Sequence, residues 1–224
     1  MSNELKREAN EARFKEVLRA TGRAGIESVI TMLENSDFFY APASTKYHSS
    51  YEGGLCQHSL NVFDCLMAKK ASPVWANVLK PYSNEMLAIV SLLHDVCKAN
   101  IYSKAMKNVK SYEEADIKAA QPFQIKYDEH GHYVWKTVVG YTFNDEEPLG
   151  HGEKSVILLQ KFITLNIDEL YAIRWHMGFS ENESNWNFVR KAMEKSPLVL
   201  ALFEADMEAS MLVERENGNI EGII

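Results

Sequence analysis

The sequence predicts an all-α protein, a helical bundle into which one small β-hairpin is inserted. Segments on both sides of the middle of the chain carry apolar residues at helical spacing. One stretch, residues 121–143, is instead dense in aromatic and β-branched residues. The chain has 224 residues, of which 46% are hydrophobic, enough for one sizeable core. We therefore expect a single domain.

The first half of the chain predicts four helices. Residues 3–22 carry Phe14, Val17 and Leu18 at helical spacing and end at Gly22, and residues 25–36 repeat the pattern. Residues 37–54 are rich in Pro, Ser and Gly and predict a loop at the mouth of a site. Helical spacing returns over 55–70. Ser83 is placed to cap a helix over 84–99.

The second half predicts the hairpin and three more helices. The sequence "DEHG" (128–131) suits the turn of a hairpin over about 120–143. Helices are expected at about 151–164, at 168–177 with Asp168 as N-cap, and at 184–214 with a break near Pro197. Residues 1–43 would pack as N-terminal helices on a main unit over 44–214, and 215–224 would fray.

Composition restricts the classes of function. The net charge of −7 and the pI near 5.6 argue against a surface that holds long nucleic acid through many phosphates. No apolar run approaches the ~20 residues of a spanning helix and no signal peptide opens the chain, so we expect a cytoplasmic protein without a membrane partner. Cys56, Cys65 and Cys97 form no CxxC pair and predict core residues rather than disulfides.

The stretch "SLLHDVCK" (91–98) places a polar pair on an apolar helix. Leu87, Val90 and His94 share one helical face, so His94 and Asp95 are expected to point inward. A buried carboxylate needs a partner. The pair could be a hydrogen-bonded feature of the core, or it could bind a divalent cation.

Two more polar residues lie in similar apolar surroundings. His58 occurs in "GGLCQHSL" and Asp206 in "LVLALFEADMEAS", where a surface carboxylate is the alternative. Together with His94 and Asp95 they form a nitrogen and oxygen ligand set. Such a set suits Mn, Fe, Mg, Co or Ni.

The order of "GGLCQHSL", "LLHDVCK" and "EADMEAS" resembles that of the HD-domain metal-dependent phosphohydrolases, over residues 44–212. The resemblance implies an HD-type helical bundle in which His58, His94, Asp95 and Asp206 bind a metal ion. Many members of that family bind two ions and have two further histidines, in the order of His151 and His176 here. Asp95 would then bridge two ions per chain. Alternatively, His151 and His176 contact phosphate or cap helices around a single ion.

Several cationic and aromatic residues are candidates for contact with substrate. Lys98 matches the lysine of the "HDxxK" motif, which implies a catalytic role on phosphate, although a solvent-exposed helix-end lysine is equally compatible. Lys154 and Arg174 could bind phosphate. The loop residues Tyr47, His48 and Tyr51 could line the entrance.

The predicted function is hydrolysis of a phosphate ester through a water activated by metal. A partial resemblance to HD domains of relaxase-associated proteins and 3′-5′ exoribonucleases favours short or single-stranded nucleic acid, whereas the acidic charge favours a nucleotide as the small-molecule partner. The alternative is a single-metal or non-catalytic nucleotide-binding regulatory module of a phage or mobile element. A third hypothesis is an accessory protein in which metal only stabilises the fold.

Overall fold

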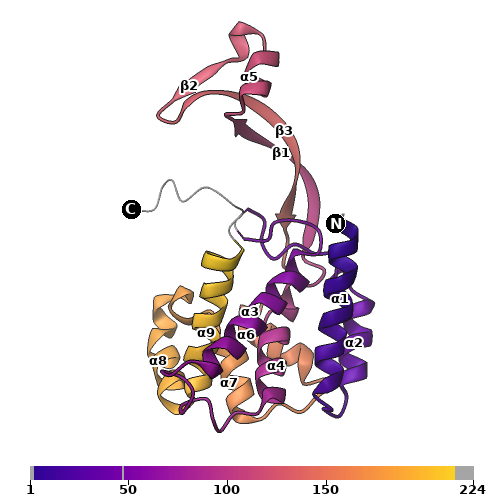
Figure 1. Cartoon of the computed structure of the whole chain (residues 1–224), viewed down its shortest axis with the longest axis vertical. Helices are drawn as coiled ribbons and strands as arrows, with labels where there is room; N and C mark the ends of the chain where they lie inside the picture. The colour runs from indigo at the N-terminus through magenta and orange to yellow at the C-terminus, as the bar shows by residue number, and fades with distance from the viewer. Residues whose placement is uncertain (1–2, 47, 215–224) are drawn as a thin grey trace.

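The computed structural model describes residues 3–46 and 48–214, in which a β-sheet arm projects from a helical body (Figure 1). We call residues 102–143 the arm and the remaining described residues the body. Tyr47 and the tail expected to fray, 215–224, lie outside the described residues. The body contains α1 (Asn3–Ala20), α2 (Ile26–Glu34), α3 (Gly54–Ala71), α4 (Asn84–Leu93), α6 (His151–Leu159), α7 (Ile167–Trp175), α8 (Trp186–Lys195) and α9 (Pro197–Glu208).

Helix α3 lies at the centre of the body. It packs against α1, α4 and α9, and its Leu55, Leu60 and Leu66 are fully buried. Helix α7 packs in turn against α4, α6 and α9. The helices expected to carry the candidate ligands are therefore direct neighbours.

Several expected helix boundaries are confirmed. The side chain of Ser83 caps α4 by accepting a hydrogen bond from the backbone N–H of Met86 at 3.1 Å. Pro197 is the first residue of α9, so the long C-terminal helix is broken where proline predicts. Beyond α9, one π-helical segment, Ala209–Val213, completes the described chain.

The expected N-cap of α7 is wrong. Asn166, not Asp168, occupies that position, because its side chain accepts the N–H of Glu169 at 3.0 Å. The Glu169 carboxylate accepts the backbone N–H of Asn166 in return at 2.9 Å, which makes a complete capping box. Asp168 lies in the first turn, where a negative charge favours the helix dipole.

The arm confirms a small β element over 120–143 in a mostly helical protein and extends it by one strand that was not expected. The protein is mostly helical, with a three-stranded antiparallel sheet in the order β1-β3-β2. Strand β1 (Tyr102–Ser111) pairs along β3 (Gly131–Phe143), and the short β2 (Lys126–Asp128) pairs with the start of β3. The turn at 128–131 is where it was expected, between β2 and β3. Helix α5 (Glu114–Ala119) lies at the far end of the arm (Figure 1).

The cysteines agree with the prediction that they belong to the core. Cys56 and Cys97 are buried, Cys65 is half-buried, and all three are free. Separately, none of the helices within residues 3–46 and 48–214 combines the length and apolar character that crossing a membrane requires.

Candidate metal centre

His58 is placed by a tight loop at the start of α3. Gly54 passes so close to this loop that a Cβ would lie 2.0 Å from the Ser49 carbonyl oxygen, so no larger residue fits. The preceding Gly53 has φ 83°, in the left-handed region. His58 follows in the second turn and is buried between α3 and its neighbours.

His94 and Asp95 stand where α4 ends, which corrects the helix expected over 84–99. Asp95 leaves the helical conformation, with φ −107° and ψ 18°, and Val96–Lys98 form one 3₁₀ turn. The N–H of Lys98 donates to the Asp95 carbonyl at 2.9 Å, and that of Cys97 donates to the Ser155 hydroxyl of α6 at 3.2 Å. These bonds replace α-helical ones, and the carboxylate of Asp95 is turned into the body at 2% exposure.

His151 and His176 approach each other because α6 and α7 pack closely. A Cβ on Gly152 would lie 2.1 Å from the Arg174 carbonyl oxygen, so the glycine permits this contact. His151 begins α6 and His176 follows the last residue of α7. Their ring centroids are 5.4 Å apart, and His176 is also 4.8 Å from His94.

Asp206 comes from α9 and closes the cluster. Its Oδ1 lies 3.2 Å from Nε2 of His58. Ligand atoms of Asp206, His94 and His176 lie within 4.8 Å of one another. The structure thus brings together the six residues that the sequence suggested as ligands: His58, His94, Asp95, His151, His176 and Asp206.

The two carboxylate oxygens of Asp95 face different pairs of histidines. Oδ2 lies 3.6 Å from Nε2 of His58 and 3.4 Å from Nε2 of His94. Oδ1 lies 2.7 Å from Nε2 of His151 and 3.4 Å from Nε2 of His176. Asp95 is therefore the geometric centre of the cluster.

The charges of the cluster depend on one another. Burial disfavours the charged form of His58, but Asp206 and Glu214 outweigh it and raise its pKa to about 10. Burial likewise opposes charge on His151, yet the hydrogen bond that its Nε2–H donates to Asp95 raises the pKa of His151 to about 9. The pKa of Asp95 stays well below its usual value despite burial, because Lys98 and the histidines favour the carboxylate. Without a cation, protonated His58, His151 and Lys98 thus balance the negative charge of the carboxylates.

Two imidazoles offer nitrogen atoms that form no hydrogen bond with the described residues, although both lie near the Asp95 carboxylate. Nδ1 of His94 donates to the Ser91 carbonyl at 2.7 Å, and Nδ1 of His176 donates to that of Ile173 at 2.7 Å. Their buried Nε2 atoms form no hydrogen bond within the described part of the chain. An imidazole held by its Nδ1–H presents a lone pair on Nε2, which is the usual arrangement of a metal-binding histidine. These residues fit a bound metal ion.

Lys98 contributes a cation to the same cluster. Its Nζ lies 2.7 Å from Oδ2 of Asp95. Burial opposes its charge, but the carboxylate of Asp95 raises the pKa of Lys98 above its usual value. Lys98 therefore remains charged beside the ligands.

Three neighbours of the ligands were not predicted as partners. Oε1 of Glu214 accepts a hydrogen bond from Nδ1 of His58 at 2.8 Å, and Cys97 Sγ lies 3.3 Å from Nδ1 of His151. The His48 ring centroid lies 4.9 Å from that of His58; the sequence had placed His48 only at the entrance. The sequence offered one indication that Cys97 lies near the ligands, namely its position two residues after Asp95 in "HDVCK".

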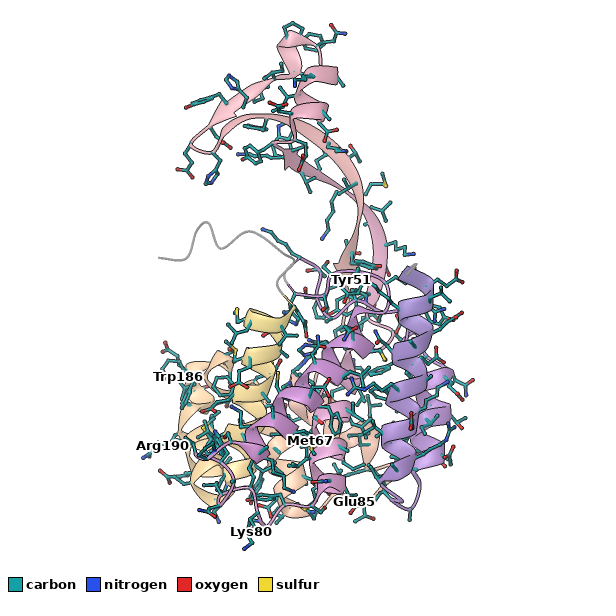
Figure 2. The ribbon with its side chains drawn as sticks, in the orientation of Figure 1. Tyr51, Met67, Lys80, Glu85, Trp186 and Arg190 are labelled. Carbon is teal, nitrogen blue, oxygen red and sulfur yellow. The ribbon has the colours of Figure 1, made fainter. Side chains whose placement is uncertain are left out.

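The other substrate candidates lie near the cluster but are held by carboxylates or lie at the surface. Nζ of Lys154 donates to Asp145 at 2.6 Å. The Arg174 guanidinium pairs with Glu153 and Glu181 and lies 3.7 Å from the Trp175 ring centroid. Tyr51 is exposed where the arm joins the body (Figure 2).

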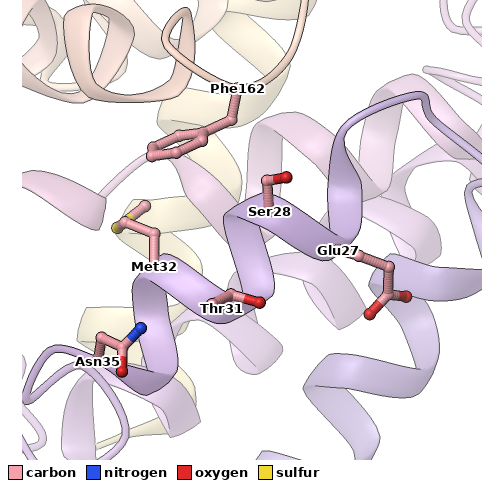
Figure 3. A pocket seen from close by; sticks show the side chains of 6 residues that line it. All are labelled: Glu27, Ser28, Thr31, Met32, Asn35 and Phe162. Carbon is pink, nitrogen blue, oxygen red and sulfur yellow. The ribbon is translucent and has the colours of Figure 1, made fainter.

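A surface groove elsewhere on the body is separate from this cluster. It has a volume of about 500 Å³ and lies along α2 beside Phe162 (Figure 3). The described residues that line it are Glu27, Ser28, Thr31, Met32, Asn35 and Phe162, and none of them is a candidate ligand.

Comparison of the chain with protein-family models, with curated proteins and with solved structures found no match.

Proposed function

We propose that this protein is a metal-dependent phosphohydrolase with an HD-type helical bundle, and that it cleaves a phosphate ester of a nucleotide or a short nucleic acid. The observation that carries the proposal is the position of Asp95, whose two oxygens face separate histidine pairs. A carboxylate in that position suits a bridge between two cations.

The ligand sets follow from this division. His58, His94, Asp95 and Asp206 would hold one divalent cation, and Asp95, His151 and His176 the other. Bound cations would supply Lewis-acid activation of water and neutralise the phosphoryl oxygens. Nitrogen and carboxylate oxygen ligands suit Mn, Fe, Co or Ni, and Mg less well because it prefers oxygen.

Residues of the chain position the ligands and add charge. The Ser91 and Ile173 carbonyls fix the tautomers of His94 and His176, so that each Nε2 points into the cluster. The Lys98 ammonium lies within hydrogen-bond reach of Asp95, where it can also contact a non-bridging phosphate oxygen. Burial excludes bulk water from these groups, which strengthens their electrostatic effect on a bound phosphate.

The test is a hydrolysis screen with Mn²⁺, Co²⁺ or Ni²⁺ and the Asp95→Ala variant. Substrates are nucleoside mono-, di- and triphosphates, cyclic dinucleotides and short oligonucleotides. We expect metal-dependent release of phosphate or nucleotide by the wild type, and a loss of about a thousandfold or more in Asp95→Ala. Asp64→Ala is the matched control, because the Asp64 carboxylate is 51% exposed and pairs only with Arg13 among the described residues.

The result also separates the rival hypotheses. Recovery of every substrate intact, with tight nucleotide binding, would favour the regulatory module. Global unfolding on chelation, with no turnover when metal is restored, would favour a purely structural metal.

A further inference from the structure

One face of the arm is open. In the β1–β3 pairing, Lys104 is opposite Tyr141, Met106 is opposite Val139, and Lys110 is opposite Trp135, so these side chains share a face. The opposite face is partly covered by α5, whose Asp116 bonds to Ser111 and Lys136. Side chains of the arm project well away from the body (Figure 2).

Aromatic rings form a row along the open face. The Tyr133 ring centroid is 5.8 Å from that of Tyr112 and 5.9 Å from that of Trp135. Nζ of Lys110 lies 4.5 Å from the Tyr133 ring. Trp135 is 56% exposed. The exposed rings of Tyr112 and Trp135, on either side of half-buried Tyr133 and its neighbouring cation, match the surface on which unpaired bases stack.

A groove at the tip of the arm has the same character. Its volume is about 630 Å³, and its lining combines aliphatic, aromatic and cationic side chains: Ile117, Pro122, Ile125, Lys126, Tyr127 and His132. The Tyr127 and His132 rings are 5.3 Å apart. The groove is large enough for a nucleobase, and Lys126 adds a charge suited to phosphate.

The charge of the arm differs from that of the body. The arm has six lysines against five acidic residues, a net charge of +1, which leaves −8 for the rest of a chain whose total is −7. It also holds eight of the 24 aromatic residues. The ion pairs of Lys110 with Asp128 and of Lys104 with Glu52 lie at the surface, where such pairs are weak and phosphate can replace the carboxylate.

The arm is also attached beside the candidate metal centre. It is inserted between Lys98 and His151, and the hydroxyl of Tyr102 at its base donates to the Ala43 carbonyl at 3.2 Å. The arm rises from the body at this end (Figure 1). Trp135 is opposite Lys110, eight residues along β1 from Tyr102, so a strand bound there would run about 26 Å along the arm to its base.

We propose that the arm binds single-stranded nucleic acid, with unpaired bases stacked on Tyr112, Tyr133 and Trp135 and lysines near the phosphates. Binding by the arm is independent of catalysis. Only the second step, presentation of a phosphodiester of that strand to the metal centre, rests on the proposed function. The substrate class would then be a single-stranded polynucleotide rather than a free nucleotide.

The test is binding of a fluorescent oligothymidylate of about 20 nucleotides to the full chain, measured by anisotropy without added metal. We expect the Tyr133→Ala, Trp135→Ala double variant to bind at least about tenfold more weakly, and Trp135→Phe to retain binding because the ring remains. Val139→Ala is the control, since it shortens a 63% exposed aliphatic side chain on the same face. Affinity should fall with added salt, and a blunt duplex should bind less well than the single strand.

Hydrolysis of a small phosphodiester with Mn²⁺ by the wild type is measured in parallel. Hydrolysis of that ester without oligonucleotide binding, or equal binding by the double variant, overturns the arm proposal and leaves the proposed function intact. Aromatic-dependent oligonucleotide binding without ester hydrolysis supports the arm and contradicts the proposed function. If light scattering instead shows a dimer that Met106→Ala dissociates, and no oligonucleotide binds, a second copy covers this face and the proposal is wrong.

Discussion

The body and the arm use similar residues in opposite ways. In the body, polar side chains such as His94 and Asp95 are buried among leucines, so each must find a charge or hydrogen-bond partner inside the protein. In the arm, apolar side chains such as Trp135 and Val139 are exposed and belong to no core. A buried polar cluster and a row of exposed rings are both compatible with a bound ligand, as proposed above for metal in the body and for a single strand on the arm.

After Asp95→Ala, the largest effect within the body is expected from removing one histidine pair of Asp95. The double variant His151→Ala, His176→Ala should lose one of two bound ions, because Oδ1 of Asp95 then has no histidine beside it. Hydrolysis should fall about a hundredfold or more. Metal content after dialysis, determined by mass spectrometry, measures the ions per chain.

The result decides between one ion and two. A wild-type stoichiometry near one, with activity retained in the double variant, would falsify the two-metal arrangement. His130→Ala in the arm is the control, because His130 is exposed and lies outside the cluster.

Metal affinity should rise with pH. The metal-free pKa values of His58, about 10, and His151, about 9, exceed the usual value, so each is protonated near neutral pH. A cation must displace one proton from each ring that it binds, which makes affinity increase about tenfold per pH unit per proton. Between about pH 6 and pH 8 we expect a gain of about a hundredfold per ion, measured by calorimetry in buffers of different ionisation enthalpy.

The stability of the metal-free protein should change with pH in the direction opposite to metal affinity, which provides a control. A raised histidine pKa stabilises the fold fully below the unfolded value of about 6.5, and that stability is lost as pH rises through the folded values. The unfolding midpoint of metal-free protein should therefore decrease between about pH 7 and pH 10. A midpoint that rises over this range would contradict the protonated cluster.

A smaller effect on metal affinity is expected from substitution of Glu214, because among the candidate ligands it contacts His58. Glu214→Gln removes the charge that accepts from Nδ1 of His58, and should weaken metal binding about ten- to hundredfold with the fold retained. The His58 pKa of metal-free protein, followed by NMR, should fall. Glu208→Gln is the control, since that carboxylate is 40% exposed and pairs with Lys69 rather than with a candidate ligand. Unchanged affinity and an unchanged pKa would show that Glu214 does not position His58.

The body could be predicted from the sequence because burial leaves a periodic signal. Leu55, Val62 and Leu66 of α3 are buried at helical spacing, whereas Leu87–Leu93 of α4 form an almost continuous apolar run because all seven residues are buried. Strand β1 was missed for the same physical reason. Neither face of Tyr102–Ser111 is buried in a core, so its lysines follow no alternation of period two.

The candidate site likewise contains residues that could be predicted from the sequence and one that could not. The order of His58, His94, Asp95 and Asp206 could be read along the chain, and the packing of α3, α4 and α9 brings these residues together. Their role as metal ligands stays a prediction. Glu214 could not be found in this way, because its contact with His58 depends on the π-helical segment Ala209–Val213 after α9, which no local pattern indicated.

The smallest effect is expected in the arm, from truncation of an exposed apolar side chain. Val139→Ala should change the free energy of unfolding by less than about 0.5 kcal/mol, because the side chain is 63% exposed. Leu66→Ala in α3 is the counterpart and should cost about 2–5 kcal/mol, since Leu66 is fully buried. Chemical denaturation at two protein concentrations measures both. A large, concentration-dependent cost for Val139→Ala would mean that the open face is buried between copies, and the contrast between body and arm would then disappear.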